Sequence, residues 1–241
     1  MKPFFKKLIN FILPPRCINC GKIVSEDSSL CVECFNKIRF ISKPYCKICG
    51  IPFESTEDLT QNVCGSCLSK KRRYFELERS SFIYDDNSKN ILLSLKFLDK
   101  TSYAPTVAKF MVQAGTDIFK ENPDLIIPVP LHYMRLIKRK YNQSALLANE
   151  ISKLTGIKTD LFSLKRHKNT TPQVKFTGKE RIKNVHGAFV VKKSENIKGK
   201  SIVLIDDVMT TGSTLKECAI ALKKVGAKKI YALTAARTLK K

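Results

Sequence analysis

The feature that most restricts the fold of this chain is a set of four C-x-x-C pairs within residues 17–67, which hold eight of its nine cysteines. The pairs are Cys17/Cys20, Cys31/Cys34, Cys46/Cys49 and Cys64/Cys67. Two residues between cysteines allow a tight knuckle that directs both thiolates at one ion, and two knuckles complete a closed tetrahedral zinc site. A redox dithiol would account for one such pair but not for four. The pattern therefore predicts two structural zinc ions.

The spacing leaves open which pairs share an ion. Consecutive pairing gives two zinc ribbons in series, whereas pairing of the first knuckle with the third gives a cross-brace; the sequential spacing favours ribbons. Apolar residues in this region follow neither a helical nor a strand period, so it cannot build a core unaided. We therefore expect residues 17–70 to form a double zinc ribbon whose folding energy comes from the metal.

Residues 1–16 are basic and apolar, yet they do not read as a secretory signal. Lys6 and Asn10 interrupt the apolar stretch, and no small-residue cleavage site follows before Cys17. The apolar residues on one helical face are Phe5, Leu8, Ile9 and Ile12. We expect an amphipathic helix that docks on the body, with contact to a membrane surface as the alternative.

The cysteines also bear on the cellular location. No segment approaches the ~20 consecutive apolar residues that span a bilayer. Without an export signal, paired cysteines fit a reducing compartment with bound metal better than disulfides. The sequence therefore predicts a cytoplasmic protein with no transmembrane segment.

The pattern changes after a basic linker at residues 70–73, and residues 79–241 alternate short apolar runs with amphipathic segments. This alternation is typical of an α/β domain with a parallel sheet flanked by helices. The expected strands are 81–84, 125–129, 188–191, 201–205 and 230–234. The expected helices are 89–98, 105–119, 144–154 and 215–225. The final strand, helix and strand form a βαβ unit, which requires parallel strands.

Candidate chemistry concentrates in residues 203–215, where an apolar strand is followed by Asp206 and Asp207 and then by small hydroxylated residues around Gly212. Ligands of open α/β sheets bind at the carboxyl ends of the strands. Backbone N–H groups before a helix can surround a phosphate at the positive end of the helix dipole. The adjacent carboxylates suit the two hydroxyls of a ribose attached to that phosphate, with Mg²⁺ nearby. The run thus predicts a site for a ribose phosphate.

This run resembles the phosphoribosyl-pyrophosphate loop of the type I phosphoribosyltransferases. A narrower resemblance, over nearly the whole chain, is to the ComF family of competence-associated proteins, which combine such a domain with a double zinc ribbon. The residues that carry it, besides the cysteine pairs, are Val129-Pro130, Arg135, Arg139, Tyr141-Asn142-Gln143, Arg166, Thr170, Gln173, Arg181 and Asn184-Val185.

The resemblance implies a type I phosphoribosyltransferase-like fold and a site for phosphoribosyl pyrophosphate (PRPP) with Mg²⁺. The implied binding residues are Asp206, Asp207, Val208, Met209, Thr210, Thr211, Gly212, Ser213 and Thr214. Arg135 and Arg139 would lie near the pyrophosphate, and the segment from Arg166 to Arg181 would belong to a loop over the site. No general base is evident among His132, His167 and His186.

The charge of the chain suggests a polyanionic partner. The formal net charge is +23, and residues 131–200 hold 17 Lys and Arg against 4 Asp and Glu. With the ComF resemblance, this favours handling or uptake of single-stranded DNA during natural transformation, in contact with proteins of the DNA-uptake machinery. The alternatives are an active phosphoribosyltransferase with an unknown acceptor, and a solvated basic surface without a ligand. A zinc-dependent transcription factor is disfavoured because no helix after the cysteine pairs carries a clear base-reading face.

Overall fold

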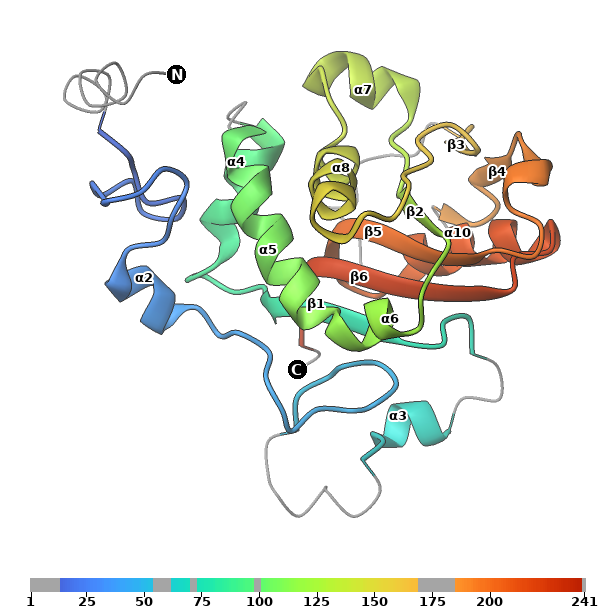
Figure 1. Cartoon of the computed structure of the whole chain (residues 1–241), viewed down its shortest axis with the longest axis horizontal. Coiled ribbons are helices and arrows are strands. Elements are labelled where there is room, and N and C mark those ends of the chain that lie inside the picture. Colours follow the sequence, from blue (N-terminus) through green and yellow to red (C-terminus); the bar gives the residue numbers. More distant parts are fainter. Residues whose placement is uncertain (1–13, 54–61, 70–72, 98–100, 169–184, 240–241) are drawn as a thin grey trace.

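The computed structural model describes residues 14–53, 62–69, 73–97, 101–168 and 185–239. The centre of the fold is a four-stranded parallel sheet in the order β1-β6-β5-β2 (Figure 1). Its strands are β1 (Glu78–Ile83), β2 (Leu125–Pro128), β5 (Ser201–Met209) and β6 (Lys229–Arg237). The predicted α/β class with a parallel sheet flanked by helices is confirmed.

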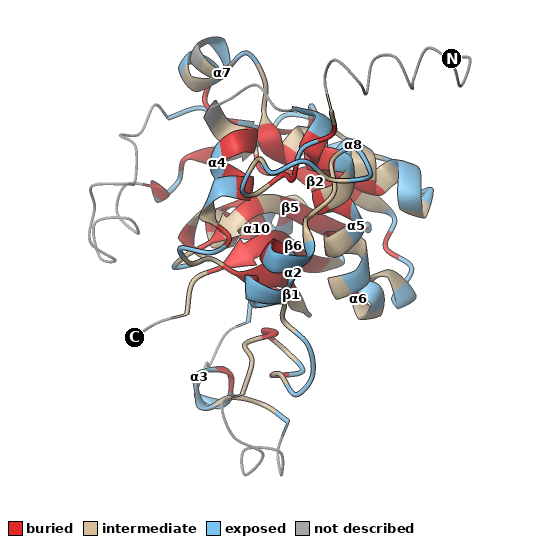
Figure 2. Ribbon diagram, turned by 90° about the vertical axis from the view of Figure 1, so that its left-hand side faces the viewer, coloured by how far each residue is buried: buried red, intermediate tan, exposed pale blue. Residues whose placement is uncertain are grey.

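Helices cover both faces of this sheet because residues of β5 alternate between them. Val203 and Ile205 pack on α4, α5 and α8, whereas Ile202 and Leu204 pack on α10. Figure 2 shows the buried residues gathered in the sheet and on the helix faces turned toward it. The helices of this body are α4 (Lys89–Phe97), α5 (Ala104–Ala114), α6 (Thr116–Lys120), α7 (Tyr133–Arg139), α8 (Gln143–Thr155) and α10 (Ser213–Lys224).

The remaining elements are short. An antiparallel pair, β3 (Leu164–Arg166) and β4 (Phe189–Val191), lies beside α10. Two 3₁₀ helices are η2 (Thr101–Tyr103) and η4 (Ser194–Asn196), and the cysteine-rich region contains α2 (Val32–Lys37) and α3 (Gly65–Leu68). No helix in the described ranges is long and apolar enough to cross a membrane.

Two predicted elements differ from the structure. The single helix expected over residues 105–119 is divided at Gly115 into α5 and α6, and a Cβ at Gly115 would lie only 3.1 Å from Leu233 on the sheet. The strand expected to end at Ile205 continues to Met209, because β6 extends alongside it and Thr238 N–H donates to the Met209 carbonyl at 3.0 Å. Asp206 and Asp207 therefore lie within the last residues of β5 that pair with β6, and not after the end of the strand.

The chain that follows the first two cysteine pairs, Cys17/Cys20 and Cys31/Cys34, runs along the outer edge of the sheet beside β1. Ile41 N–H donates to the Ser81 carbonyl, and Ile83 N–H donates to the Arg39 carbonyl, each at 2.9 Å. Phe40 lies between these bonds, and its ring packs edge-on against Phe82. Residues 39–41 thus continue the sheet beyond β1 in the antiparallel direction.

The region of the last two cysteine pairs, Cys46/Cys49 and Cys64/Cys67, is called the second ribbon below. Two buried arginines of the sheet, Arg79 in β1 and Arg237 in β6, hold it. Arg79 donates to the carbonyls of Lys47 at 2.8 Å and Ile48 at 3.2 Å, and Arg237 donates to the carbonyl of Cys49. The three acceptors are consecutive residues of the Cys46–Cys49 knuckle. Because a buried guanidinium must keep its acceptors, these bonds fix the knuckle against the sheet.

Candidate functional site

The carboxyl end of the sheet contains a cavity of about 340 Å³. It is bounded by the end of β5 and the start of α10, by the segment after β2, by α7, by the start of α8, and by side chains of α4 and β3. This is the edge at which open α/β sheets bind ligands. A volume of this size is within the range of small-molecule sites.

The loop from Thr210 to Gly212 connects β5 to α10, and Gly212 adopts a φ of +72°, which favours glycine. The helix then begins at Ser213, so its unpaired N–H groups and positive dipole end face the loop. Thr210, Gly212, Ser213 and Thr214 line the cavity. Thr211 does not; its hydroxyl bonds the Ser213 hydroxyl at 2.8 Å, and it lines a different cavity behind the loop.

The two predicted carboxylates lie at the floor of the first cavity but have different partners. Asp206 accepts hydrogen bonds from the Ser144 hydroxyl at 3.0 Å and from the Asp207 N–H at 2.9 Å. Asp207 accepts from Gln143 Nε2 at 3.2 Å and forms an ion pair with Lys96 Nζ at 2.9 Å. Asp207 is buried, whereas Asp206 is half-buried.

These environments move the two pKa values in opposite directions. Burial and the charge of Asp207 raise the pKa of Asp206 to about 7. Burial would also raise the pKa of Asp207, but the Lys96 ammonium holds it below its ordinary value. Burial would lower the pKa of Lys96, but the carboxylates, Asp207 first, keep it above its ordinary value. The pair therefore carries close to one negative charge at pH below 7, and Lys96 neutralises it.

Lys96 lines the cavity, but its role there was not predicted from the sequence. It lies in the last turn of α4, next to the buried Leu95, and its side chain is 21% exposed. A single lysine beside the apolar stripe of a helix is usually a solvated charge, so only the tertiary contact with Asp207 identifies it. Gln143 and Ser144, the first residues of α8, were likewise not predicted to contact the carboxylates.

Arg135 and Arg139, predicted near the pyrophosphate, both line the cavity. Arg166, predicted to belong to a loop over the site, also lines the cavity but lies in strand β3, paired with Phe189 of β4. Arg166 is buried, and its guanidinium lies 5.5 Å from the Phe189 ring centroid. Burial and the charge of Arg135 lower the pKa of Arg166 to about 10, and burial and Arg139 lower that of Arg135. Cations that lower one another's pKa would be stabilised by a bound anion. Arg181, Thr170, Gln173 and Asn184 lie outside the described residues.

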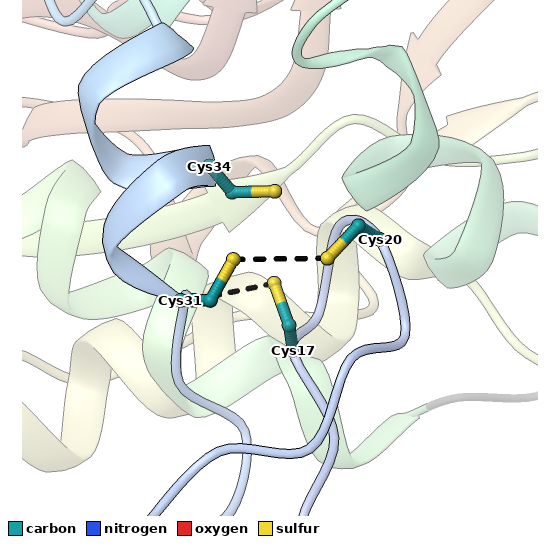
Figure 3. A group of neighbouring side chains, drawn as sticks. All are labelled: Cys17, Cys20, Cys31 and Cys34. Atoms are coloured by element: carbon teal, nitrogen blue, oxygen red, sulfur yellow. Dashed lines mark hydrogen bonds between the residues drawn. The ribbon is translucent and has the colours of Figure 1, made fainter.

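The eight paired cysteines form two clusters, 17/20/31/34 and 46/49/64/67, and within each cluster the sulfur atoms lie within 4.8 Å of one another. Figure 3 shows the four sulfurs of the first cluster directed toward a common centre. The predicted consecutive pairing is confirmed, and the alternative cross-brace is wrong. Cys218, by contrast, lies on the buried face of α10 in the apolar core, as expected.

The geometry of both clusters fits zinc. Four sulfurs at about 2.3 Å from one ion would be separated by roughly 3.8 Å. The Sγ atoms of Cys20 and Cys31 are 3.7 Å apart, and those of Cys49 and Cys64 are 3.6 Å apart. Burial raises the pKa of Cys17, but backbone N–H donors, including those of Cys20 and Cys31, outweigh it and lower the value to about 6. Each cluster thus supplies four sulfur ligands and no open position, as structural sites do.

Comparison with known proteins agrees with this arrangement. The double zinc ribbon domain matches residues 8–68, and the phosphoribosyl transferase domain matches residues 97–241. Among solved structures, glutamine PRPP amidotransferase from B. subtilis aligns with a TM-score of 0.40 and 15% identity over 58% of this chain and 30% of that longer chain. Purine phosphoribosyltransferase from Pyrococcus horikoshii aligns with a TM-score of 0.35 and 21% identity, over 58% and 85%. The two domain matches show that the chain is a zinc-ribbon protein with a phosphoribosyltransferase domain.

Relatives along the whole chain narrow this class. Competence protein F of Haemophilus influenzae is 32% identical over 228 residues, which cover 92% of this chain and 96% of that protein. DNA utilization protein YhgH of Escherichia coli strain K12 is 28% identical, over 87% and 91% of the two chains. Competence protein ComFC of Bacillus subtilis is 25% identical, over 85% and 82%. The chain belongs to the ComF family of competence proteins.

The two cysteine clusters predict the metal content of single variants. The purified protein should contain two zinc ions per chain, and Cys49→Ser should retain one, because a closed four-sulfur site loses most of its affinity with one ligand. Cys218→Ala, which changes a cysteine outside the clusters, should retain both. Elemental analysis of the purified proteins measures the ratio. Two zinc ions in Cys49→Ser would contradict this assignment of ligands.

The unequal environments of the carboxylates predict opposite effects on stability. The folded pKa of Asp206, about 7, exceeds its ordinary value of 3.8, so its ionisation costs stability increasingly as the pH rises between these values. Asp206→Asn removes this cost and should raise the melting temperature at pH 8, by roughly 4–8 °C for on the order of 2 kcal/mol. The gain should shrink as the pH falls toward 5.

Asp207→Asn is the matched variant. Its carboxylate has a lowered pKa, so its contribution is present at pH 8 and is lost only as the pH falls below the ordinary value. The substitution leaves the buried Lys96 ammonium without its ion-pair partner and should lower the melting temperature at pH 8. Differential scanning fluorimetry across pH compares the two. The same sign of effect from both variants would refute the unequal roles.

Proposed function

We propose that the first cavity binds PRPP with Mg²⁺. The observation that carries this proposal is that one cavity is lined by the carboxylate pair, by the loop before α10 and by three arginines. Each of these groups suits one part of the ligand. Backbone N–H groups and hydroxyls favour a phosphate ester, carboxylates favour sugar hydroxyls, and clustered arginines favour a diphosphate.

In this proposal the 5′-phosphate lies on the loop of Thr210–Thr214. Asp206 accepts from a ribose hydroxyl, and Asp207 accepts from the second hydroxyl while retaining its ion pair with Lys96. Arg135, Arg139 and Arg166 contact the pyrophosphate. Mg²⁺ would be held by the carboxylates and the ligand's own oxygens, and it would neutralise charge on the pyrophosphate. Arg181 and Thr211 remain candidates for indirect or loop contacts.

We also propose that the protein acts on single-stranded DNA during natural transformation, in the cytoplasm and together with proteins of the uptake machinery. Relatives along the whole chain are named as competence and DNA utilization proteins. The net charge of +23 supports a polyanionic partner. A phosphoribosyl ligand would then serve binding or regulation rather than turnover.

The second candidate function is phosphoribosyl transfer to an acceptor, and the arginine cluster favours it. Three cations at one side of the cavity would stabilise pyrophosphate as it leaves the sugar carbon. Among the described residues that line the cavity there is no histidine to act as a general base. His132 is buried, and its ring accepts from the Met134 N–H at the start of α7. An acceptor would therefore have to attack the sugar carbon without a histidine of the cavity lining as its general base.

The cavity predicts binding of Mg²⁺-PRPP that depends on Asp206. Because a hydrogen bond to a charged group contributes about 1.5–3 kcal/mol, Asp206→Asn should weaken binding by roughly 10- to 100-fold while leaving the protein folded. Isothermal titration calorimetry measures both affinities. Asp86→Asn, at an exposed carboxylate outside the cavity, is the control and should bind as the unchanged protein does.

Two measurements, of binding and of pyrophosphate release, test the ribose assignment and decide between the candidate functions. Equal binding by Asp206→Asn and the unchanged protein would contradict the assignment of the ribose hydroxyls. Release of pyrophosphate when candidate acceptors are added would favour transfer, and binding without release would favour the non-catalytic role.

The basic charge predicts DNA binding that weakens steeply with salt. For single strands the logarithm of the association constant falls with the logarithm of salt concentration by about 0.7 per neutralised phosphate. Fluorescence anisotropy with labelled oligo(dT) between low and moderate ionic strength gives this slope. A flat dependence would rule out electrostatic tracking of DNA. Asp206→Asn should retain DNA binding, because it removes no cation.

A further inference from the structure

A second cavity, of about 520 Å³, lies on the other side of the loop that follows β5. One wall is the second zinc ribbon, with Cys49, Cys64 and Cys67, and the opposite wall is the loop from Met209 to Ser213. Residues 73–75, which lead from the ribbon into the sheet, close a third side. Neither carboxylate of the first cavity reaches this space. It therefore requires its own explanation.

The lining combines three cations with aromatic surface. The cations are Arg73, Lys216 and Arg237, and the aromatic residues are Tyr74 and Phe75. Lys216 Nζ lies 4.8 Å from the centroid of the Tyr74 ring, so a charged group and a flat ring are adjacent at the cavity wall. Such a pairing suits a ligand with a phosphate beside a planar base.

Arg237 places a buried positive charge at the cavity wall next to the second cysteine cluster. Its side chain is 8% exposed, and its Nη1 donates to the Cys49 carbonyl. Its Nε is buried and has no hydrogen-bond partner among the described residues. The Nε atom is inaccessible from the cavity, so Arg237 contributes the positive charge of its guanidinium to the cavity wall rather than an open donor at Nε.

Two acidic residues, Glu78 and Glu217, also line the cavity, but they do not offset the positive charge of the three cations. Glu217 is occupied on the far side, where it accepts from the Gly187 N–H at 2.8 Å and lies 3.4 Å from His186 Nδ1. Glu78 also lines the cavity, so the three cations exceed the two carboxylates. The sulfur atoms of Cys49, Cys64 and Cys67 also line this wall, but when bound to zinc they would offer no acceptor as strong as a phosphate oxygen.

We propose that this second cavity binds a nucleotide unit. Its phosphate contacts Arg73, Lys216 and Arg237, and its base packs on Tyr74. This deepens the proposed action on single-stranded DNA, on which it rests, by naming where one nucleotide of the strand is held. Ser213 lines both cavities, and its hydroxyl bonds Thr211 on the far side of the loop, so the two ligands would contact opposite faces of one loop.

The test uses the full chain with Arg73→Ala and Lys216→Ala together, both on solvent-accessible side chains. The control is Lys223→Ala with Lys224→Ala, which removes two exposed cations from the other end of the same helix. The probes are labelled oligo(dT), thymidine monophosphate and Mg²⁺-PRPP. Zinc content and melting temperature establish that each variant is folded.

The first variant should bind oligo(dT) about 10-fold more weakly, and its salt slope should fall by roughly 0.7, which corresponds to the one phosphate held in this cavity. The control should remain within about twofold, and both should bind Mg²⁺-PRPP as the unchanged protein does. In mass-spectrometric lysine acetylation, oligo(dT) should protect Lys216 and leave Lys224 reactive. Binding of thymidine monophosphate alone, with the same dependence on Lys216, would support the cavity and overturn its use for DNA.

Equal loss of oligo(dT) binding in variant and control, or no protection of Lys216, would overturn the second site while leaving DNA binding itself intact. If the unchanged protein binds neither oligo(dT) nor the mononucleotide, the second site and the proposed DNA function both fail. Calorimetry with Mg²⁺-PRPP would still test the first cavity in that case.

Discussion

The structure depends on holding two adjacent carboxylates, Asp206 and Asp207, in a largely buried position at the end of a central strand. Two such charges repel one another, and burial penalises both. The fold offsets this with the Lys96 ammonium and with donors from Gln143 and Ser144 at the start of α8. These partners come from α4 and α8, so the site exists only when both helices pack on the same face of the sheet. Burial and the remaining repulsion from Asp207 raise the pKa of Asp206. A ligand that donates hydrogen bonds to the ionised carboxylate would lower this pKa again.

The second zinc ribbon is joined by hydrogen bonds to the sheet that carries these carboxylates. Arg79 and Arg237 extend from neighbouring strands and donate to three consecutive carbonyls of the Cys46–Cys49 knuckle. Arg237 is paired in the sheet with Met209, the last residue of β5 before the loop that leads to α10. A continuous series of contacts therefore joins the second metal site to the loop proposed to bind phosphate. A rigid, metal-supported knuckle is a suitable partner for a loop whose backbone N–H groups must hold a fixed direction.

Local patterns were sufficient for much of this architecture. Short continuous apolar runs and the βαβ pattern predicted the strands around 125–129, 201–205 and 230–234, and the C-x-x-C spacing predicted the paired clusters. Other features depend on contacts that no local pattern encodes. Lys96 is an ordinary helical lysine until α4 packs beside Asp207, and Thr211 was assigned to the phosphate loop although it faces the other cavity. The extension of β5 to Met209 arises from pairing with β6, and the closeness of Leu233 leaves no room for a Cβ at position 115, where the helix is divided; both are long-range contacts.

The central claim is that the carboxylates and the loop before α10 act together on one phosphorylated ribose. A crystal structure of the protein grown with Mg²⁺-PRPP tests it most directly. The account predicts the ribose hydroxyls within about 3 Å of Asp206, the 5′-phosphate on the backbone N–H groups of residues 210–214, and the pyrophosphate beside Arg135 and Arg166. Electron density for the ligand outside this cavity, or with its ribose directed away from the carboxylates, would contradict it.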